Sequence, residues 1–379
     1  MNLQPYLKLM SEQQATDMYF TTGAPVSMRI DGKMRPVGKS MLTPGTTKKL
    51  AYDLLSPSQI KDFEAHLELN MGMSYTDLGR FRANIYMQRG EVSMVIRFIR
   101  ADIPSIESLM LPDVYKTMMS KEKGLILVVG ATGMGKSTSL ASMLDYRNER
   151  DTGHILTIED PIEFTFHHKK CIIGQREVGL DTLSFDNALR EAMREAPDVI
   201  MIGEARDRET VKAALRYADT GHLCLTTMHA TNASQALERF LNFFPNEEHN
   251  QIVMDLSLNL NAILAQRLVT SVDGERIPVV EVLVNTPYIS QMIRDKHFNE
   301  IKEAMTKGAS VGMHTFDQAL HSLFKSGKID IKTALANADS SSDLEWKINF
   351  GGDEQDMERD RPDTLQFPSD DPHELDVPE

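Results

Sequence analysis

The stretch Gly130-Ala131-Thr132-Gly133-Met134-Gly135-Lys136-Ser137-Thr138 fits the pattern of a phosphate-binding loop, with four residues between a glycine and Gly-Lys-Ser. The unbroken apolar run before it, residues 125–129, is typical of a strand buried on both faces. Residues 139–144 follow as the expected start of a helix. Glycines let backbone N–H groups surround a polyphosphate, and the helix adds the positive end of its dipole. This context predicts that the chain binds a nucleoside triphosphate.

We expect two residues of this loop to contact the ligand through their side chains. Lys136 should reach the β- and γ-phosphates, and the Ser137 hydroxyl should hold Mg²⁺, so ATP and Mg²⁺ are the expected ligands. The full set of expected phosphate-binding positions in the loop is Gly130, Thr132, Gly133, Gly135, Lys136, Ser137 and Thr138.

Composition excludes several classes of protein. The chain has 379 residues, enough for two domains, and two cysteines, which suggest a reducing cytosol. Its N-terminus does not resemble a signal peptide, and no apolar run approaches a membrane span. Residues 339–379 carry 14 acidic and 3 basic residues and so account for −11 of the net charge of −14. The near-neutral remainder argues against a nucleic-acid-binding surface.

Residues 1–100 alternate between strand and helix patterns and are expected to form an N-terminal domain. Residues 26–30 and 33–37 flank an Asp-Gly turn and predict a hairpin, and residues 46–68 have helical spacing. Residues 79–87 and 92–100 predict a second hairpin. It would place Arg80 and Arg82 on one face of a strand and Arg97 on the partner. These arginines are either solvated surface charges or a source of positive charge for a nucleotide.

A linker and a larger α/β domain are expected to follow. Residues 101–123 contain two prolines and one short predicted helix, 114–119, which favours a hinge. Residues 124–338 show apolar strand candidates at 125–129, 154–158, 198–202 and 223–227, in the rhythm of a parallel sheet covered by helices. Residues 339–379 are rich in Ser, Asp, Glu and Pro, so we expect a disordered tail that either solvates the protein or docks elsewhere.

One helix of this domain is well marked. It begins at Ser184, has an apolar stripe, and is expected to end at Pro197. Arg190 and Arg194 fall off the stripe, one turn apart, and form either a solvated flank or a contact with a neighbouring subunit.

Acidic and imidazole side chains cluster at the ends of the predicted strands. Glu159, Asp160 and Glu163 follow the second strand, Glu204 follows the third, and His229 follows the fourth, with His222 just before it. In open α/β sheets ligands bind beyond the carboxyl ends of the strands. Hydrolysis of a triphosphate needs a carboxylate that orients water and a polar group near the γ-phosphate, so we expect these groups to converge on it.

Together these segments resemble the sequence boxes of a known family. Residues 130–138, 155–164, 203–207 and 220–229 resemble, in order, the Walker A, Asp, Walker B and His boxes of secretion-type hexameric ATPases. Within that superfamily residues 1 to about 338 are similar to the type IV pilus retraction ATPases. The resemblance implies an α/β fold with a RecA-like phosphate-loop ATPase domain and an N-terminal α+β, PAS-like domain.

The resemblance also implies roles for single residues. Glu163 would activate water, and Glu204 would be the Walker B acid near Mg²⁺ and water. Glu159 and Asp160 would be supporting acids, and His222 and His229 would sense or couple the γ-phosphate. Arg82 and Arg97 match the arginines that the N-terminal domain of this family brings onto the nucleotide, whereas the match of Arg80 is weaker.

Departures from the family pattern point to a particular branch. Ala131 and Met134 differ from the usual Gly-Pro-Thr-Gly-Ser-Gly-Lys, at positions that need not donate a side chain to phosphate. Where retraction motors carry Ala-Ile-Arg-Asn-Leu-Ile-Arg, residues 288–294 keep only the last arginine. With the acidic tail, this resembles the accessory retraction ATPase, a paralogue of the main retraction motor.

Three other functions are less consistent with the sequence. A pilus extension or type II secretion assembly ATPase has the same boxes, but typically adds a four-cysteine zinc site that two isolated cysteines cannot provide, so no zinc is expected. A nucleic-acid translocase is disfavoured by the absence of a basic aromatic stripe. A regulatory subunit with little turnover is disfavoured by the intact Lys136, Glu163 and Glu204.

The resemblance finally implies an assembly and a location. We expect a homohexamer with Mg-ATP between the two domains at each junction, which works beside the main retraction ATPase and turns an inner-membrane platform protein. It would be cytoplasmic and peripherally associated with the inner membrane. Closure about the 101–123 hinge would deliver the arginines and drive the disassembly of the pilus.

Overall fold

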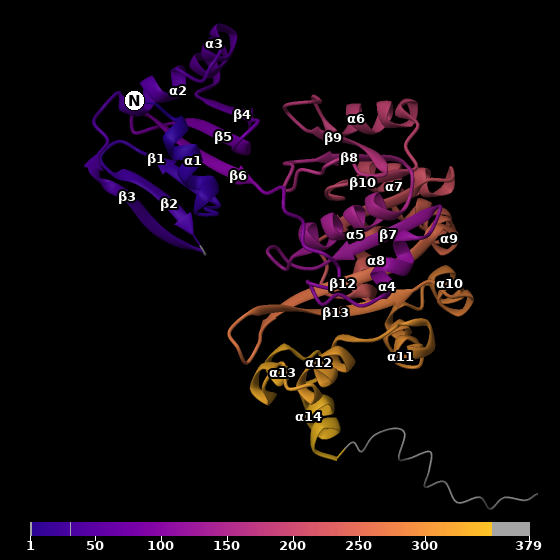
Figure 1. The fold of residues 1–379 in the computed structure, drawn as a ribbon. Helices are drawn as coiled ribbons and strands as arrows, with labels where there is room; N and C mark the ends of the chain where they lie inside the picture. The colour runs from indigo at the N-terminus through magenta and orange to yellow at the C-terminus, as the bar shows by residue number, and fades with distance from the viewer. Residues whose placement is uncertain (1, 31, 351–379) are drawn as a thin grey trace, which may run out of the picture.

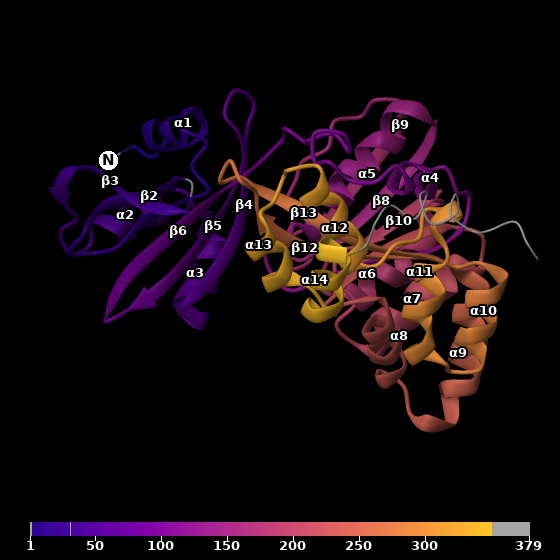
Figure 2. The same ribbon diagram turned by 90° about the horizontal axis from the view of Figure 1, so that it is seen from below.

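The structure is a computed structural model that describes residues 2–30 and 32–350. Figures 1 and 2 show an N-terminal domain that stands beside a larger C-terminal domain, with a single extended connection between them. The connection carries the helix α4 (Val114–Met119), which the sequence predicts with the same bounds.

The N-terminal domain is built on an antiparallel sheet in the order β3-β2-β1-β6-β5-β4. Both predicted hairpins form within it, as β2 with β3 and β5 with β6. Successive side chains of β5 point to opposite faces of the sheet. Phe81, Ala83 and Ile85 are therefore buried in the domain core, whereas Arg80 and Arg82 lie on the other face. The strands are β1 (Asp17–Phe20), β2 (Pro25–Ile30), β3 (Lys33–Met41), β4 (Glu68–Tyr75), β5 (Gly79–Gln88) and β6 (Glu91–Ile99).

Three helices accompany this sheet, α1 (Gln4–Glu12), α2 (Thr46–Tyr52) and α3 (Pro57–His66). The helical spacing predicted over 46–68 is confirmed, but it forms two helices, α2 and α3, and not one continuous helix. The chain breaks because Ser56 caps α3 through a capping box with Gln59, and Pro57 occupies its first turn. Helix α3 then ends at Leu67, which adopts a left-handed conformation.

The C-terminal domain contains a sheet in the order β13-β12-β7-β11-β10-β8-β9, parallel except for β13. The interior strand β7 is buried on both faces, with Leu125 and Leu127 in one core and Ile126 and Val128 in the other. All four predicted strands form, whereas β9, β12 and β13 were not predicted. The strands are β7 (Gly124–Val129), β8 (Gly153–Glu159), β9 (Cys171–Glu177), β10 (Val199–Ile202), β11 (Leu223–Met228), β12 (Leu260–Thr270) and β13 (Arg276–Val284).

Helices cover both faces of this sheet. Helix α5 (Lys136–Arg150) packs with α4 on one face, and α6 (Phe185–Ala192), α7 (Arg208–Asp219), α8 (Ala233–Asn242) and α9 (His249–Asn259) contribute to the core on the other. Helix α6 is shorter than predicted, because the turn η1 (Met193–Glu195) and a left-handed Ala196 follow it before the proline. Arg190 and Arg194 form ion pairs with Asp186 and Glu191 along the surface of this segment.

Of the helices that follow β13, α12 and α13 pack against the β12–β13 edge and α10 packs against α9 (Figure 1). These helices are α10 (Pro287–Arg294), α11 (Ile301–Thr306), α12 (Phe316–Lys325), α13 (Ile331–Asn337) and α14 (Ser341–Phe350), with the short 3₁₀ helices η3 (Phe298–Glu300) and η4 (Ala309–Val311), while η2 (Asn246–Glu248) precedes α9. The expectation of a disordered tail is thus wrong for residues 341–350, which form α14. Residues 351–379 lie outside the described residues.

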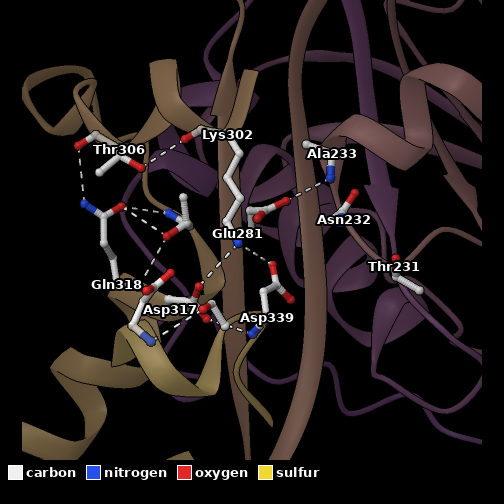
Figure 3. A network of polar contacts seen from close by, with 12 residues as sticks. Thr231, Asn232, Ala233, Glu281, Lys302, Thr306, Asp317, Gln318 and Asp339 are labelled. Carbon is white, nitrogen blue, oxygen red and sulfur yellow. Dashed lines mark hydrogen bonds and ion pairs between the residues drawn. The ribbon is translucent and has the colours of Figure 1, made fainter. Parts of the chain in front are cut away.

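An ion-pair network holds these helices against the sheet (Figure 3). The carboxylate of Asp339 lies 2.6 Å from Arg267 on β12 and 3.1 Å from Lys302 on α11, and its backbone N–H donates to Asp317. On the neighbouring strand β13, the buried Glu281 accepts a hydrogen bond from the backbone N–H of Ala233 at the start of α8. Asp339, which sequence assigned to the tail, is therefore part of the folded domain.

Candidate active site

The phosphate-binding loop leads directly from β7 into α5, whose first residue is Lys136. Two of its glycines are needed for space as well as for conformation. A Cβ on Gly130 would lie 2.5 Å from the carbonyl oxygen of Gln266, and one on Gly135, at a φ of +83°, would lie 2.8 Å from the side chain of Gln266. Gln266 on β12 also accepts a hydrogen bond from Ser139 at 2.7 Å, so β12 supports the loop from beneath.

Lys136 is folded onto its own loop. Its Nζ atom donates to the carbonyl oxygens of Gly130 at 2.8 Å and Ala131 at 3.0 Å. Burial lowers the pKa of Lys136, and the carboxylates of Glu204 and Glu163 partly oppose this. A cation placed among carbonyl groups and acids in a partly buried position is suited to receive a polyphosphate.

A cavity of about 640 Å³ opens over the loop, and most of the predicted site residues line it. It contains the side chains of Glu159, Asp160 and Glu163 after β8, Glu204 after β10 and His229 after β11. Gly130 does not line the cavity, whereas the predicted residues that do are Thr132, Gly133, Gly135, Lys136, Ser137, Thr138, Glu159, Asp160, Glu163, Glu204 and His229, and Arg206 and Arg276 lie among them. The carboxyl ends of three parallel strands therefore deliver acids and an imidazole to one phosphate loop.

Glu204 is held from two sides. Its Oε1 atom lies 3.0 Å from Nε2 of His229, and its Oε2 atom lies 2.9 Å from Nε of Arg206. Arg206 also approaches Asp160 at 3.5 Å. The row Asp160–Arg206–Glu204–His229 thus links the ends of β8, β10 and β11 and fixes the direction in which the Glu204 carboxylate faces the cavity.

The acids after β8 differ in environment. Glu159 is buried and accepts hydrogen bonds from Thr157 at 2.7 Å and Gln175 at 3.4 Å. Burial raises its pKa to about 7 in spite of these hydrogen bonds. Glu163, in contrast, is exposed at the cavity. Glu163 is therefore accessible from the cavity, whereas the Glu159 carboxylate is enclosed by its hydrogen-bond partners.

The N-terminal arginines lie outside the cavity. Arg82 and Arg97 are cross-strand partners in the hairpin of β5 and β6. The Nη1 atom of Arg82 lies 3.4 Å from Glu177 of the C-terminal domain, and Nε of Arg97 lies 2.9 Å from Asp17 of its own domain. Neither arginine lines the cavity, so a role on the nucleotide requires movement of the domain or a neighbouring subunit.

His222 is not part of this site. His222 immediately precedes β11, which runs parallel to β7. The N-terminal end of β11 therefore lies beside the N-terminal end of β7, and the phosphate loop follows the opposite end of β7. The ring of His222 instead contacts Thr220 and the carbonyl oxygen of Tyr217. The prediction that His222 joins the other side chains around the phosphate is wrong for this chain.

Two arginines of the cavity were not assigned from sequence. Arg206 lies within the Walker B segment, and its charge next to Glu204 was a usable signal. Arg276 comes from β13, and its Nη2 atom donates to the carbonyl oxygen of Gly133 at 3.2 Å. No motif surrounds Arg276 in the sequence. It reaches the phosphate loop only through the antiparallel pairing of β13 with β12.

Comparison with known proteins agrees with this geometry. The profile of the family described as "Type II/IV secretion system protein" matches residues 3–310. The type IV pilus ATPase PilU of Pseudomonas aeruginosa is 48% identical over 93% of each chain. The retraction ATPase PilT of the same organism is 39% identical, over 89% of this chain and 98% of PilT. A crystal structure of the pilus retraction motor PilT with ADP has a TM-score of 0.85 and 40% identity, and covers 91% of this chain and 99% of that one.

The chain therefore belongs to the type II/IV secretion system protein family, which is a family of ATPases, and it shares with PilT an α/β ATPase domain that follows an N-terminal domain. Within that family it is a retraction ATPase of the PilT and PilU type, because both relatives match nearly its whole length.

Proposed function

We propose that this protein hydrolyses Mg-ATP to power retraction of a type IV pilus, as an accessory retraction motor. One observation carries the proposal: Lys136, Glu163 and Glu204, from three separate strand ends, line one cavity. The chain is more similar to PilU, at 48% identity, than to PilT, at 39%, and residues 288–294, which keep only the last arginine of the retraction-motor motif, support the accessory role.

The residues of the cavity suit the parts of phosphoryl transfer to water. Lys136 and the loop amides bind the β- and γ-phosphates, and Arg276, hydrogen bonded to the loop, adds charge beside them. Glu163 orients the attacking water and accepts its proton. Glu204 is held by Arg206 and His229. A shift of Glu204 on binding or loss of the γ-phosphate would therefore move His229 and the end of β11.

The same residues fit a magnesium ion. Ser137 opens the first turn of α5, and Glu204 is the acid across the cavity, so a hydroxyl and a carboxylate can join phosphate oxygens and water around the ion. The ion, when bound, neutralises the charge that develops between the β- and γ-phosphates. Ser137 and Glu204 are therefore the residues that would hold it.

Arg82 and Arg97 are proposed to act only after movement of the N-terminal domain. Their shared position on the β5–β6 hairpin means that one rigid rotation about the linker would carry both. Arginines supplied in this way accelerate hydrolysis by about 10³–10⁵-fold in other phosphate-loop enzymes. Hydrolysis would thus depend on domain closure, which couples chemistry to motion.

The assembly follows from the family. We propose a homohexamer in the cytoplasm, on the inner membrane at the pilus base, where it works with the main retraction ATPase and an inner-membrane platform protein. No helix in the part of the chain that the structure describes is long and apolar enough to cross a membrane. Force would then pass through contact between the ring and the platform protein.

A gene deletion, complemented with wild-type or Glu163→Gln protein, tests this function. Cells without the gene should remain piliated but move poorly on surfaces, because pili form and are not withdrawn efficiently. Wild-type protein should restore movement and the variant should not. Cells without surface pili would indicate pilus extension instead, and full rescue by the variant would indicate a regulatory role without hydrolysis.

A further inference from the structure

Glu177 occupies an unusual position between the two domains. It is the last residue of β9, directly beside Glu159 on β8, and it is 1% exposed. It does not line the cavity, and no motif marks it. A carboxylate at such depth needs compensating partners, because burial raises its pKa and disfavours its charged form.

The two oxygens of Glu177 have different partners. Oε2 accepts a hydrogen bond from the backbone N–H of Ile162 at 3.4 Å, and Ile162 immediately precedes Glu163. Oε1 makes no hydrogen bond and faces Nη1 of Arg82 at 3.4 Å, while Nη2 of Arg80 lies 3.8 Å from Oε2. One carboxylate therefore joins the segment of Glu163 to two arginines of the N-terminal domain.

A second contact ties the same segment to the N-terminal domain. Arg100, which follows β6, pairs with Phe164, and its carbonyl oxygen accepts a hydrogen bond from the N–H of Thr165 at 3.0 Å. Residues 162–165 are thus held at one end through Glu177 and at the other by Arg100. Because β6 also pairs with the strand of Arg82, movement of that hairpin acts on both ends of the Glu163 segment.

The charge of Glu177 sets the stability of this resting arrangement. If Arg82 turns to a phosphate, Glu177 loses its nearest cation while it stays buried, and removal of one partner from a buried pair is strongly unfavourable. The carboxylate and the nucleotide therefore compete for Arg82. The free energy needed to release Arg82 raises the nucleotide concentration at which the domains close.

We propose that Glu177 is a positioning residue for hydrolysis, which holds Arg82 away from the nucleotide in the resting state and anchors Ile162 so that Glu163 faces the cavity. This inference rests on the proposed role of Arg82 on the nucleotide. The two functions of the Glu177 carboxylate can be separated by substitution. Retention of Arg82 needs the negative charge, whereas anchoring of Ile162 needs only an acceptor oxygen.

Two substitutions in the full-length protein separate them. Glu177→Gln keeps an acceptor for Ile162 and removes the charge that holds Arg82, so KM for ATP should fall by about threefold to tenfold with kcat preserved. Glu177→Ala also removes the acceptor, so kcat should fall by about tenfold or more. Hydrogen exchange of the amides of residues 162–165 should accelerate in the Ala variant and stay unchanged in the Gln variant. This measurement tests the hydrogen bond between Ile162 and Glu177 independently of ATP hydrolysis.

Glu195→Gln is the matched control, because Glu195 is paired at 2.7 Å with Arg176, next to Glu177 on β9, and touches neither the N-terminal domain nor the cavity. Its kinetics and exchange should equal those of the wild type. A Glu177→Gln variant with the KM of this control would overturn the competition for Arg82. Equal exchange in all variants would overturn the anchor.

An Arg82→Ala variant distinguishes failure of this inference from failure of the proposed function. Full turnover by Arg82→Ala would remove the proposed role of Arg82, and the competition with it. If Arg82→Ala is inactive while Glu177→Gln behaves as the control, Arg82 keeps its role and only the part assigned to Glu177 is wrong.

Discussion

The Nε2 atom of His229 lies 3.0 Å from Oε1 of Glu204, although the two residues follow different strands of the sheet. Arg206 occupies the other oxygen of the same carboxylate. Both oxygens of the Glu204 carboxylate therefore have a partner, and the two contacts together fix its orientation. The end of β11 is thus in direct contact with the carboxylate that we propose acts near Mg²⁺.

Replacement of His229 by Asn should lower kcat by about tenfold or more, because Glu204 loses one of its two orienting contacts, with a smaller effect on nucleotide affinity. Steady-state hydrolysis and binding of a fluorescent ATP analogue measure the two quantities. His297→Asn, an exposed histidine of the same domain, is the control and should be unchanged. Equal losses of affinity and kcat would contradict an orienting role.

Lys136→Ala should abolish hydrolysis, with a loss of about 100-fold or more, because it removes the cation expected at the β- and γ-phosphates. Phosphate release by the purified protein measures this loss. Lys8→Ala changes an exposed lysine of α1 and should leave the rate unchanged. Near-normal turnover of Lys136→Ala would place the site elsewhere.

Glu163→Gln should retain nucleotide binding and stop hydrolysis. The exposed side chain lies at the cavity, and the amide keeps its size but cannot accept the proton of water. Equilibrium binding of ATP and a single-turnover assay separate the two effects. Lost binding, with a normal thermal unfolding curve, would make Glu163 a binding residue and not the base.

The double variant Arg82→Ala, Arg97→Ala should lose hydrolysis by about 10³-fold, while binding to the phosphate loop persists. Arg97 also pairs with Asp17, so the thermal unfolding of the N-terminal domain must be followed in parallel. Arg29→Ala, which removes the other arginine near Asp17, is the matched control for that structural contact. Hydrolysis at full speed in the double variant would refute closure as the trigger.

Glu281 should make stability depend on pH. Burial raises its pKa to about 7, with Asp339 adding to the rise and Lys302 and Arg267 opposing it. The native state then binds a proton more tightly than the unfolded chain, so its free energy of unfolding falls as pH rises from about 4.5 to about 7. Each pKa unit corresponds to about 1.4 kcal/mol.

Glu281→Gln keeps an acceptor for Ala233 and cannot ionise, so it should remove that part of the pH dependence and gain stability relative to wild type above pH 7. Denaturant unfolding at pH 5 and pH 8 measures the difference. Glu303→Gln, an exposed change on α11, should shift neither curve. A difference between wild type and Glu281→Gln that is the same at both pH values would show that Glu281 does not titrate in this range.

The sequence predicted those parts of the protein that are formed by residues close together along the chain. The phosphate loop, the strand ahead of it, and the acids after β8 and β10 were all located from sequence, because each combines a buried strand with the polar groups that end it. The two N-terminal hairpins were found by alternation and turn residues. The break at Ser56 was missed, although its capping box was present in the sequence.

Long-range pairing decided the rest. Arg276 reaches Gly133 only because β13 runs antiparallel beside β12, and Glu177 meets Arg82 only because two domains touch there. His222 and His229 lie at opposite ends of β11, so only His229 is near the phosphate loop, although the two residues are close in sequence. Asp339 and α14 were assigned to a tail because residues 339–379 are rich in Ser, Asp, Glu and Pro, whereas in the structure Arg267 and Lys302 pair with Asp339 and Leu344 of α14 is buried. A single sequence records which residues are charged, but their partners depend on contacts between segments that are distant along the chain.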